Sequence, residues 1–235
     1  MTFHAQIASP LGPVLLCSEG ACLSGLYFIG QSDCPVINGM PAYKPHSGGP
    51  SAGMMDGLAI KNFRASKRDA EADLFSQAAA CLEQKGATAD LQANVGAPDA
   101  ASAEMSEMLL MQADTPAATV ALFERTRKEL AEYFAGQRQT FDIPLALSGT
   151  VFQKKVWDAL RTISYGQTVS YGDVARTAGF SAQHSRPVGA AVGRNPITII
   201  IPCHRVLSGT GTLTGYTGGL ERKVALLELE GFALQ

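Results

Sequence analysis

Long apolar runs and export signals are absent from this sequence of 235 residues. No segment approaches the roughly 18 consecutive apolar residues that a membrane span needs. The first residues also lack a basic segment followed by an apolar one, which a secretory signal would show. We therefore expect a cytoplasmic protein without a membrane partner.

Charge is scarce as well. Asp, Glu, Lys and Arg make up 17% of the residues, against about 25% in an average domain. The formal net charge is −2. Taken over the whole chain, this composition argues against a general nucleic-acid binder.

Cysteines are few, and their number is odd. The five lie at positions 17, 22, 34, 81 and 203, without the density of a small disulfide-stapled domain. We expect reduced thiols, and we interpret the first four as small core residues. The spacings of His4 and the cysteines of the first 34 residues match no recognised zinc pattern, so neither a metal nor another cofactor is predicted.

The N-terminal half contains a segment of predicted strands followed by a segment of different composition. Residues 3–8, 13–17 and 23–29 predict short strands separated by turns. Residues 31–115 are rich in Ala, Gly, Ser, Pro and Asp. We interpret them as a low-complexity insertion, partly disordered or helical, with a loop over 35–57 and a helix over 70–84.

Helical patterns dominate after Pro116. The first has apolar residues on one broad face and can end at Gly136 in the left-handed conformation. The second begins with a capping-box pattern at Thr150 to Gln153. These patterns predict two consecutive amphipathic helices.

Two shorter helices should follow. Ser170 to Asp173 is another capping-box pattern, and Gly179 can close the helix that it opens. Ser185 can cap a second helix that runs to about Gly193 and contains mostly small residues. A short helix, a turn and a small-residue helix are compatible with a helix-turn-helix, although helical hairpins of this kind also serve for packing alone.

Residues 197–201 are a run of five consecutive Ile or Thr residues, which predicts a buried strand. The strand would deliver Cys203 at its end, directly before His204 and Arg205. The histidine can lower the thiol pKa, and the arginine adds positive potential. Neighbours in an extended chain point to opposite faces, so a reactive and a structural role for Cys203 both remain open on this pattern alone.

Residues 195–206 resemble the active-site signature of the O6-alkylguanine-DNA alkyltransferases, also called methylated-DNA-protein-cysteine methyltransferases. The resemblance is continuous from about residue 116 to 231 and weaker over residues 3–30. Its other landmarks follow in order: residues 150–157, 165–166, 169–172, 186–189, 215–220 and Lys223.

The resemblance implies a chemistry. Cys203 would be the nucleophile that keeps the alkyl group, in a single turnover. His204 would take the thiol proton through a water, and Glu230 would orient the imidazole. Tyr171 would supply a proton to the departing guanine, and Asn195 would hold the turn around the cysteine.

The resemblance also implies substrate contacts. The carbonyls of Cys203 and Val206 would read the guanine amino group, with Tyr216 and Thr217 near O6. The partner would be duplex DNA containing O6-alkylguanine, bound by a monomer. Acceptance of O4-alkylthymine stays open.

Base flipping through the minor groove is implied as well, because O6 of a stacked guanine is out of reach. Arg186 would fill the gap left by the base, and small residues at 189 and 190 would let the helix approach the groove. The residues expected at the DNA are Arg186, Ser170, Tyr171, Gly189, Ala190 and Arg194. The charge distribution fits, because residues 150–235 contain 9 Lys and Arg against 5 Asp and Glu, whereas residues 1–149 contain 10 against 16.

The fold implied is α+β. Residues 1–30 and 116–149 would form an N-terminal α/β domain of the ribonuclease-H-like type, interrupted by the insertion at 31–115. Residues 150–235 would form a helical DNA-binding domain like a winged helix-turn-helix. The insertion is far longer than the usual connection in the family.

Three other hypotheses remain. The protein could recognise lesions without repairing them, but such relatives replace the cysteine, and position 203 is cysteine. It could be a Cys-His thiol hydrolase, which would need an oxyanion hole for which the sequence offers no candidate. It could also be a degenerate member whose N-terminal domain the insertion has disrupted.

Overall fold

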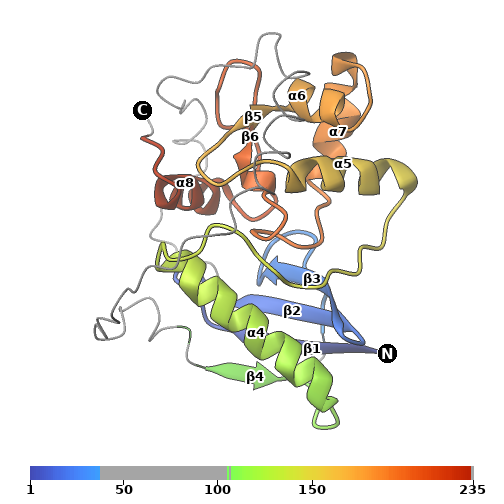
Figure 1. Cartoon of the computed structure of the whole chain (residues 1–235), viewed down its shortest axis with the longest axis vertical. Helices are drawn as coiled ribbons and strands as arrows, with labels where there is room; N and C mark the ends of the chain where they lie inside the picture. Colours follow the sequence, from blue (N-terminus) through green and yellow to red (C-terminus); the bar gives the residue numbers. More distant parts are fainter. Residues whose placement is uncertain (38–104, 106, 234–235) are drawn as a thin grey trace, which may run out of the picture.

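The computed structural model describes residues 1–37, 105 and 107–233. An N-terminal sheet with one long helix lies on one side, and a group of helices lies on the other (Figure 1). The predicted helix over 70–84 lies outside the described residues, as does most of the predicted loop over 35–57. No helix of the described part is long and apolar enough to cross a bilayer.

The N-terminal sheet is antiparallel, with the strand order β3-β2-β1-β4. Its strands are β1 (Thr2–Ile7), β2 (Val14–Glu19), β3 (Cys22–Phe28) and β4 (Met108–Leu110). The first three confirm the predicted strands. β4 comes from the range interpreted as an insertion, and its Leu110 pairs with Ala5 of β1. The end of that range therefore completes the sheet, which forms in the described residues despite the long segment between β3 and β4.

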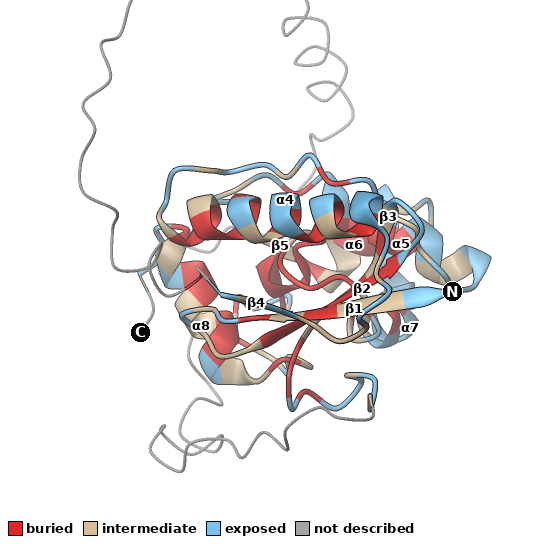
Figure 2. Cartoon of the chain, turned by 90° about the horizontal axis from the view of Figure 1, so that it is seen from below, coloured by how far each residue is buried: buried red, intermediate tan, exposed pale blue. Residues whose placement is uncertain are grey.

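Helix α4 (Ala117–Phe134) confirms the first predicted helix. It ends as expected, because Gly136 adopts φ +71° and the Gln137 N–H bonds to the Glu132 carbonyl at 2.8 Å. Its apolar side chains, such as Phe123 and Leu130, are fully buried. Figure 2 shows the buried face of α4 turned toward the sheet and its exposed face turned outward. This packing forms the core of the N-terminal part.

The C-terminal part is helical. It contains α5 (Val151–Arg161), α6 (Tyr171–Thr177), α7 (Ser185–Val192) and α8 (Leu220–Leu229), with the short parallel pair β5 (Val169–Ser170) and β6 (Val206–Leu207). Both predicted capping boxes are present, at the starts of α5 and α6. The cap predicted at Ser185 is wrong. Ser185 is already helical, because the 3₁₀ turn η1 (Ala182–His184) leads directly into α7.

The strand predicted over residues 197–201 is also wrong. Only Ile197 forms an isolated bridge, with Leu26, and Ile199 adopts φ +69°, which is a strained conformation for a β-branched residue. The segment turns because the Asn195 side chain holds both of its ends: Oδ1 accepts from Ile197 N at 3.1 Å, and Nδ2 donates to Ile201 O at 2.7 Å. We call residues 195–201 the Asn195 turn. Side-chain hydrogen bonds here override the strand preference of the run.

Candidate active site

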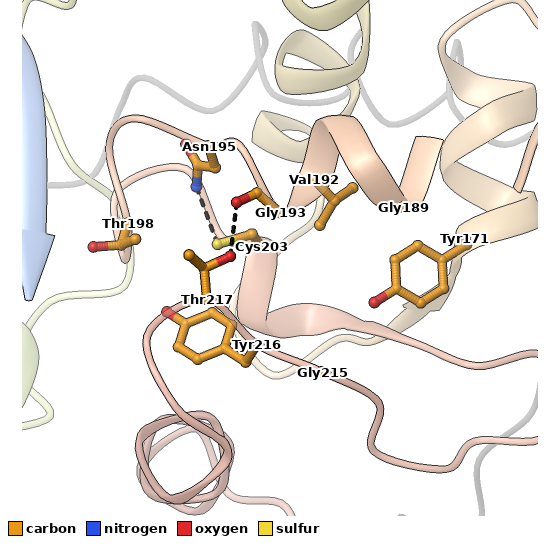
Figure 3. Close-up of a pocket in the computed structure, with 10 residues that line it drawn as sticks. All are labelled: Tyr171, Gly189, Val192, Gly193, Asn195, Thr198, Cys203, Gly215, Tyr216 and Thr217. Carbon is orange, nitrogen blue, oxygen red and sulfur yellow. Dashed lines mark hydrogen bonds between the residues drawn. The ribbon is translucent and has the colours of Figure 1, made fainter. Parts of the chain in front are cut away.

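A small pocket opens between α7, the Asn195 turn and the loop of residues 215–219, which we call the pocket loop. Its lining includes Tyr171, Gly189, Val192, Gly193, Asn195, Thr198, Cys203, Gly215, Tyr216 and Thr217 (Figure 3). The cavity is about 30 Å³, which is room for one or two water molecules. A purine base can therefore enter only if the walls separate.

Cys203 supplies the thiol in the lining of this pocket. It is 5% exposed and begins the 3₁₀ turn η2 (Cys203–Arg205). Burial raises the pKa of its thiol, and a hydrogen bond from Asn195 Nδ2 at 3.1 Å, the charge of Lys223 and the nearby Tyr216 phenol oppose that rise. The net direction is upward, so the resting side chain is a thiol and needs a proton acceptor before it can attack.

His204, the residue after Cys203, forms a buried pair with Glu230. His204 Nε2 lies 2.9 Å from Glu230 Oε1, and the His204 side chain is 0% exposed. Burial lowers the pKa of His204 despite the neighbouring carboxylate. Its other ring nitrogen, Nδ1, is buried and has no partner among the described residues. A neutral imidazole that donates from Nε2 to Glu230 leaves Nδ1 as a free acceptor.

Glu230 is the centre of a hydrogen-bond cluster. It caps α8 and accepts from Tyr133 Oη at 2.8 Å, from the Arg205 guanidinium at 2.8–3.2 Å and, more weakly, from Gly166 N at 3.3 Å. Burial opposes its ionisation, but the hydrogen bonds from His204 and Arg205 outweigh burial and lower the pKa of Glu230 to about 2. Glu230 therefore stays ionised throughout the physiological range.

Arg205 is held within this cluster. It is 5% exposed, and it also donates to the Ile163 carbonyl at 2.6 Å. The expectation that Arg205 adds positive potential at the thiol is therefore wrong, because Glu230 neutralises its charge. Residues two apart in a tight turn can point into different environments, which the sequence pattern around Cys203 did not reveal.

Lys223 supplies the positive charge instead, and sequence reasoning gave it no role. Its ammonium is buried and donates to the carbonyls of Val206 and Thr214 at 2.7 and 3.2 Å. Burial lowers its pKa to about 8, and the Cys203 thiol opposes that fall. A signal was available: Lys223, Leu226 and Glu230 recur at helical spacing on the buried face of α8. Tyr133 of α4 carried no comparable signal, since it looks like an ordinary core aromatic.

Three further predicted residues line the pocket. The Tyr171 hydroxyl lies 3.3 Å from Thr214 Oγ1, and burial raises the phenol pKa. Tyr216 is half-buried, and its buried hydroxyl lies near the Cys203 sulfur but outside hydrogen-bond geometry. Thr217 Oγ1 donates to the Gly193 carbonyl at 2.7 Å, a bond that joins the pocket loop to the end of α7 (Figure 3).

The residues predicted at the DNA do not all share one environment. Arg186, Ala190 and Arg194 are exposed on or just after α7. Gly189 faces the Tyr171 ring, where a Cβ would lie 3.6 Å from the ring edge. Ser170 is buried, and its hydroxyl is used in the capping box of α6. The Trp157 indole of α5 holds α7 in place, because its N–H donates to the Ala191 carbonyl at 2.9 Å.

Metal ligands were not predicted. Among residues 1–37, 105 and 107–233, no group of three or more His, Cys, Asp or Glu side chains is placed to hold a metal ion.

Comparisons with known proteins agree on one family. The family model described as "6-O-methylguanine DNA methyltransferase, DNA binding domain" matches residues 151–232. The chain is 51% identical over 109 residues to the methylated-DNA–protein-cysteine methyltransferase of Methanosarcina acetivorans. The matched region covers 46% of this chain and 69% of the relative. It is 56% identical over 102 residues to the methyltransferase of the same name from Mycobacterium bovis. That matched region covers 43% of this chain and 61% of the relative.

Solved structures extend the likeness beyond the C-terminal part. The Mycobacterium tuberculosis O6-methylguanine methyltransferase matches with a TM-score of 0.57 and 33% identity, covering 98% of this chain and 93% of that one. The M. tuberculosis protein OGT in complex with DNA matches with a TM-score of 0.57 and 30% identity, covering 96% and 90%. The shared fold is α+β, with an N-terminal antiparallel sheet and a C-terminal helical DNA-binding domain.

Proposed function

Because this chain belongs to the methylated-DNA–protein-cysteine methyltransferase family and has its O6-methylguanine-DNA methyltransferase activity in DNA repair, we propose that Cys203 is the acceptor. The alkyl group moves from O6 of guanine to the Cys203 sulfur and stays there, so each protein molecule repairs one lesion. The observation that carries this assignment is the thiol in the lining of the pocket, followed directly in the chain by a buried histidine with a free ring nitrogen.

This geometry supports a proton route. The Cys203 proton passes through a water to Nδ1 of His204, and the ionised Glu230 stabilises the imidazolium through Nε2. The sulfur then forms a bond to the alkyl carbon while the bond from that carbon to O6 breaks. The released electron pair makes a ring nitrogen of guanine basic, so that nitrogen needs a proton. Lys223 favours the thiolate because its charge is buried nearby.

Tyr171 is the proton donor for the departing guanine in this proposal. Its raised phenol pKa keeps it neutral at pH 7, and its side chain reaches into the pocket from the start of α6. We expect Tyr171→Phe to slow alkyl transfer by about 100-fold, since a positioned acid contributes about 10² to 10⁴. Single-turnover kinetics on an O6-methylguanine duplex measure the effect. Tyr27→Phe, in β3, is the matched control, and equal slowing in both variants would contradict the role.

DNA binding is assigned to the α6 and α7 pair. We interpret this pair as the helix-turn-helix of a winged domain, and the sheet with α4 as a ribonuclease-H-like domain. Helix α7 presents Arg186 and Ala190 to solvent while Gly189 lines the pocket, which suits a helix that lies in the minor groove beside a flipped base. The protein would act as a monomer on duplex DNA in the cytoplasm, where its described cysteines stay free.

Arg186 is proposed to occupy the space that the flipped base leaves. We expect Arg186→Ala to slow repair of a lesion in duplex DNA by about tenfold or more, because flipping costs a few kcal/mol that the arginine offsets. Reaction with a free O6-alkylguanine base should be unchanged. Arg161→Ala, another exposed arginine of the same domain, is the control, and equal slowing with duplex and free base would contradict the assignment.

Counting repaired lesions per protein molecule tests the whole proposal. A fixed amount of protein is titrated with excess duplex carrying one O6-methylguanine. We expect the yield to level off at one repaired lesion per molecule. Repeated turnovers would favour a hydrolase, and binding without repair would favour a lesion-recognition protein.

A further inference from the structure

Strand β3 of the N-terminal sheet supports the first wall of the pocket. Leu26 N donates to the Pro196 carbonyl at 2.9 Å, and the Leu26 carbonyl accepts from both N and Oγ1 of Thr198 at 3.0 and 2.9 Å. These bonds fix the Asn195 turn, which positions Cys203. The N-terminal part is therefore joined to the active site by specific hydrogen bonds as well as by packing.

The same strand supports the second wall through Arg222. This residue lies in the first turn of α8, and it is 9% exposed. Its guanidinium stacks over the Phe28 ring at the end of β3, 4.6 Å from the centroid. Its Nε donates to the Leu11 carbonyl at 2.9 Å, and its Nη1 donates to the Gly218 carbonyl at 2.8 Å.

Gly218 belongs to the pocket loop, and its surroundings are crowded. A Cβ at this position would lie 2.6 Å from the Tyr216 ring and 3.3 Å from the Phe28 ring. Arg222, Phe28 and Tyr216 thus meet at the backbone of the loop that also carries Thr217. Any shift of the guanidinium would be transmitted directly to two side chains that line the pocket.

We propose that Arg222 is a positioning residue for alkyl transfer, which holds the pocket loop against β3 while the alkylated base is bound. The proposal rests on the function proposed above. The cavity of about 30 Å³ is too small for the base, so the pocket loop and α7, which the Thr217–Gly193 bond joins, would have to separate when the base enters. The contacts from α8 then hold the loop.

Arginine suits this task for a physical reason. Its planar fork can donate in two directions while its face stacks on an aromatic ring, and lysine cannot reproduce that combination. Loss of the fork should let Tyr216 and Thr217 drift from their positions, and a displacement of about 1 Å at a reacting site can cost about 100-fold in rate. Arg222 itself is not among the groups that shift the pKa of the Cys203 thiol, so its loss reaches that pKa only through the displaced Tyr216 phenol.

Arg222→Met and Arg222→Lys test the proposal against Arg127→Met. Arg127 also donates to a backbone carbonyl, that of Met105 at 2.7 Å, but it lies on α4 away from the pocket. The rate of methyl transfer from an O6-methylguanine duplex is measured per folded molecule. The rate of Cys203 alkylation by iodoacetamide, followed against pH by peptide mass, reports the thiol itself.

We expect Arg222→Met to slow methyl transfer by about tenfold or more, Arg222→Lys to recover part of that loss, and Arg127→Met to stay within about twofold of the unchanged protein. The iodoacetamide pH profile of Arg127→Met should match that of the unchanged protein. Any shift of the profile in Arg222→Met should be small and toward higher pH, because a displaced Tyr216 no longer opposes the raised thiol pKa. The inference is overturned if Arg222→Met and Arg127→Met transfer equally fast, or if the shift of the profile is large enough to account for the slower transfer. If the unchanged protein transfers no methyl group, the proposed function fails instead.

Discussion

Cys203→Ala should lose methyl transfer entirely while keeping its affinity for DNA. The sulfur is the only atom in the pocket lining that can keep an alkyl group as a stable thioether, and no other cysteine lines that pocket. Arg186 and Ala190, which we propose to face DNA, are exposed on α7, whereas the Cys203 side chain is buried, so binding should survive. Transfer is followed with an O6-methylguanine duplex, and binding is followed with the same duplex at several salt concentrations.

Cys17→Ala is the matched control for this variant. Cys17 is also 5% exposed, but it lies in β2, and burial raises the pKa of its thiol to about 12. This variant should transfer a methyl group normally. Repair by Cys203→Ala, or loss of repair in a folded Cys17→Ala protein, would show that the nucleophile has been assigned to the wrong residue.

Glu230→Gln should lower both the free energy of unfolding and the rate of methyl transfer. The amide cannot neutralise Arg205, so a buried guanidinium loses its counterion, which typically costs about 3 to 5 kcal/mol. The amide also cannot hold the His204 imidazolium, so transfer should slow by about 100-fold. Glu228→Gln, an exposed neighbour on α8, should change neither quantity.

The pH dependence of unfolding checks the physical cause. The pKa of Glu230 falls from 4.5 to about 2 in the folded protein, which corresponds to about 3 kcal/mol. A carboxyl with a lowered folded pKa stabilises the protein above its unfolded pKa, and that stabilisation is lost as the pH falls toward about 2. Denaturation is therefore measured at several pH values for the unchanged protein and for Glu230→Gln. The difference between their free energies of unfolding should become smaller below about pH 4.5. A difference that is constant from pH 7 to pH 3 would contradict this explanation.

Local signals in the sequence predicted most of the elements. The capping boxes at Thr150 and Ser170 and the left-handed Gly136 depend on neighbours within a few residues, so the sequence alone identifies them. The strand prediction over residues 197–201 is wrong for the opposite reason, because distant contacts decide the conformation there. The strand preference of these residues is overridden by the Asn195 side chain and by Leu26, which is 172 residues from Thr198 in the sequence.

In the candidate site, too, some residues could be identified from the sequence and others only from the structure. The resemblance identified Cys203, His204 and Glu230, and the structure pairs His204 with Glu230 and places Cys203, the preceding residue, in the pocket lining. The roles of Tyr133, Lys223 and Arg222 were missed because they depend on which carbonyl or carboxylate lies opposite each side chain. The charge count was affected too: Arg205, Arg222 and Lys223 are buried, so fewer of the nine C-terminal cations face DNA than the sequence suggested.

The mass of the Cys203 peptide after repair tests the central claim most directly. The protein is incubated with a slight excess of duplex carrying one O6-methylguanine, digested, and compared with protein treated with unmodified duplex. We predict a gain of one methyl group on the peptide that contains Cys203, in nearly every molecule, with no gain on peptides that contain other cysteines. A repaired duplex with an unmodified Cys203 peptide would contradict the account.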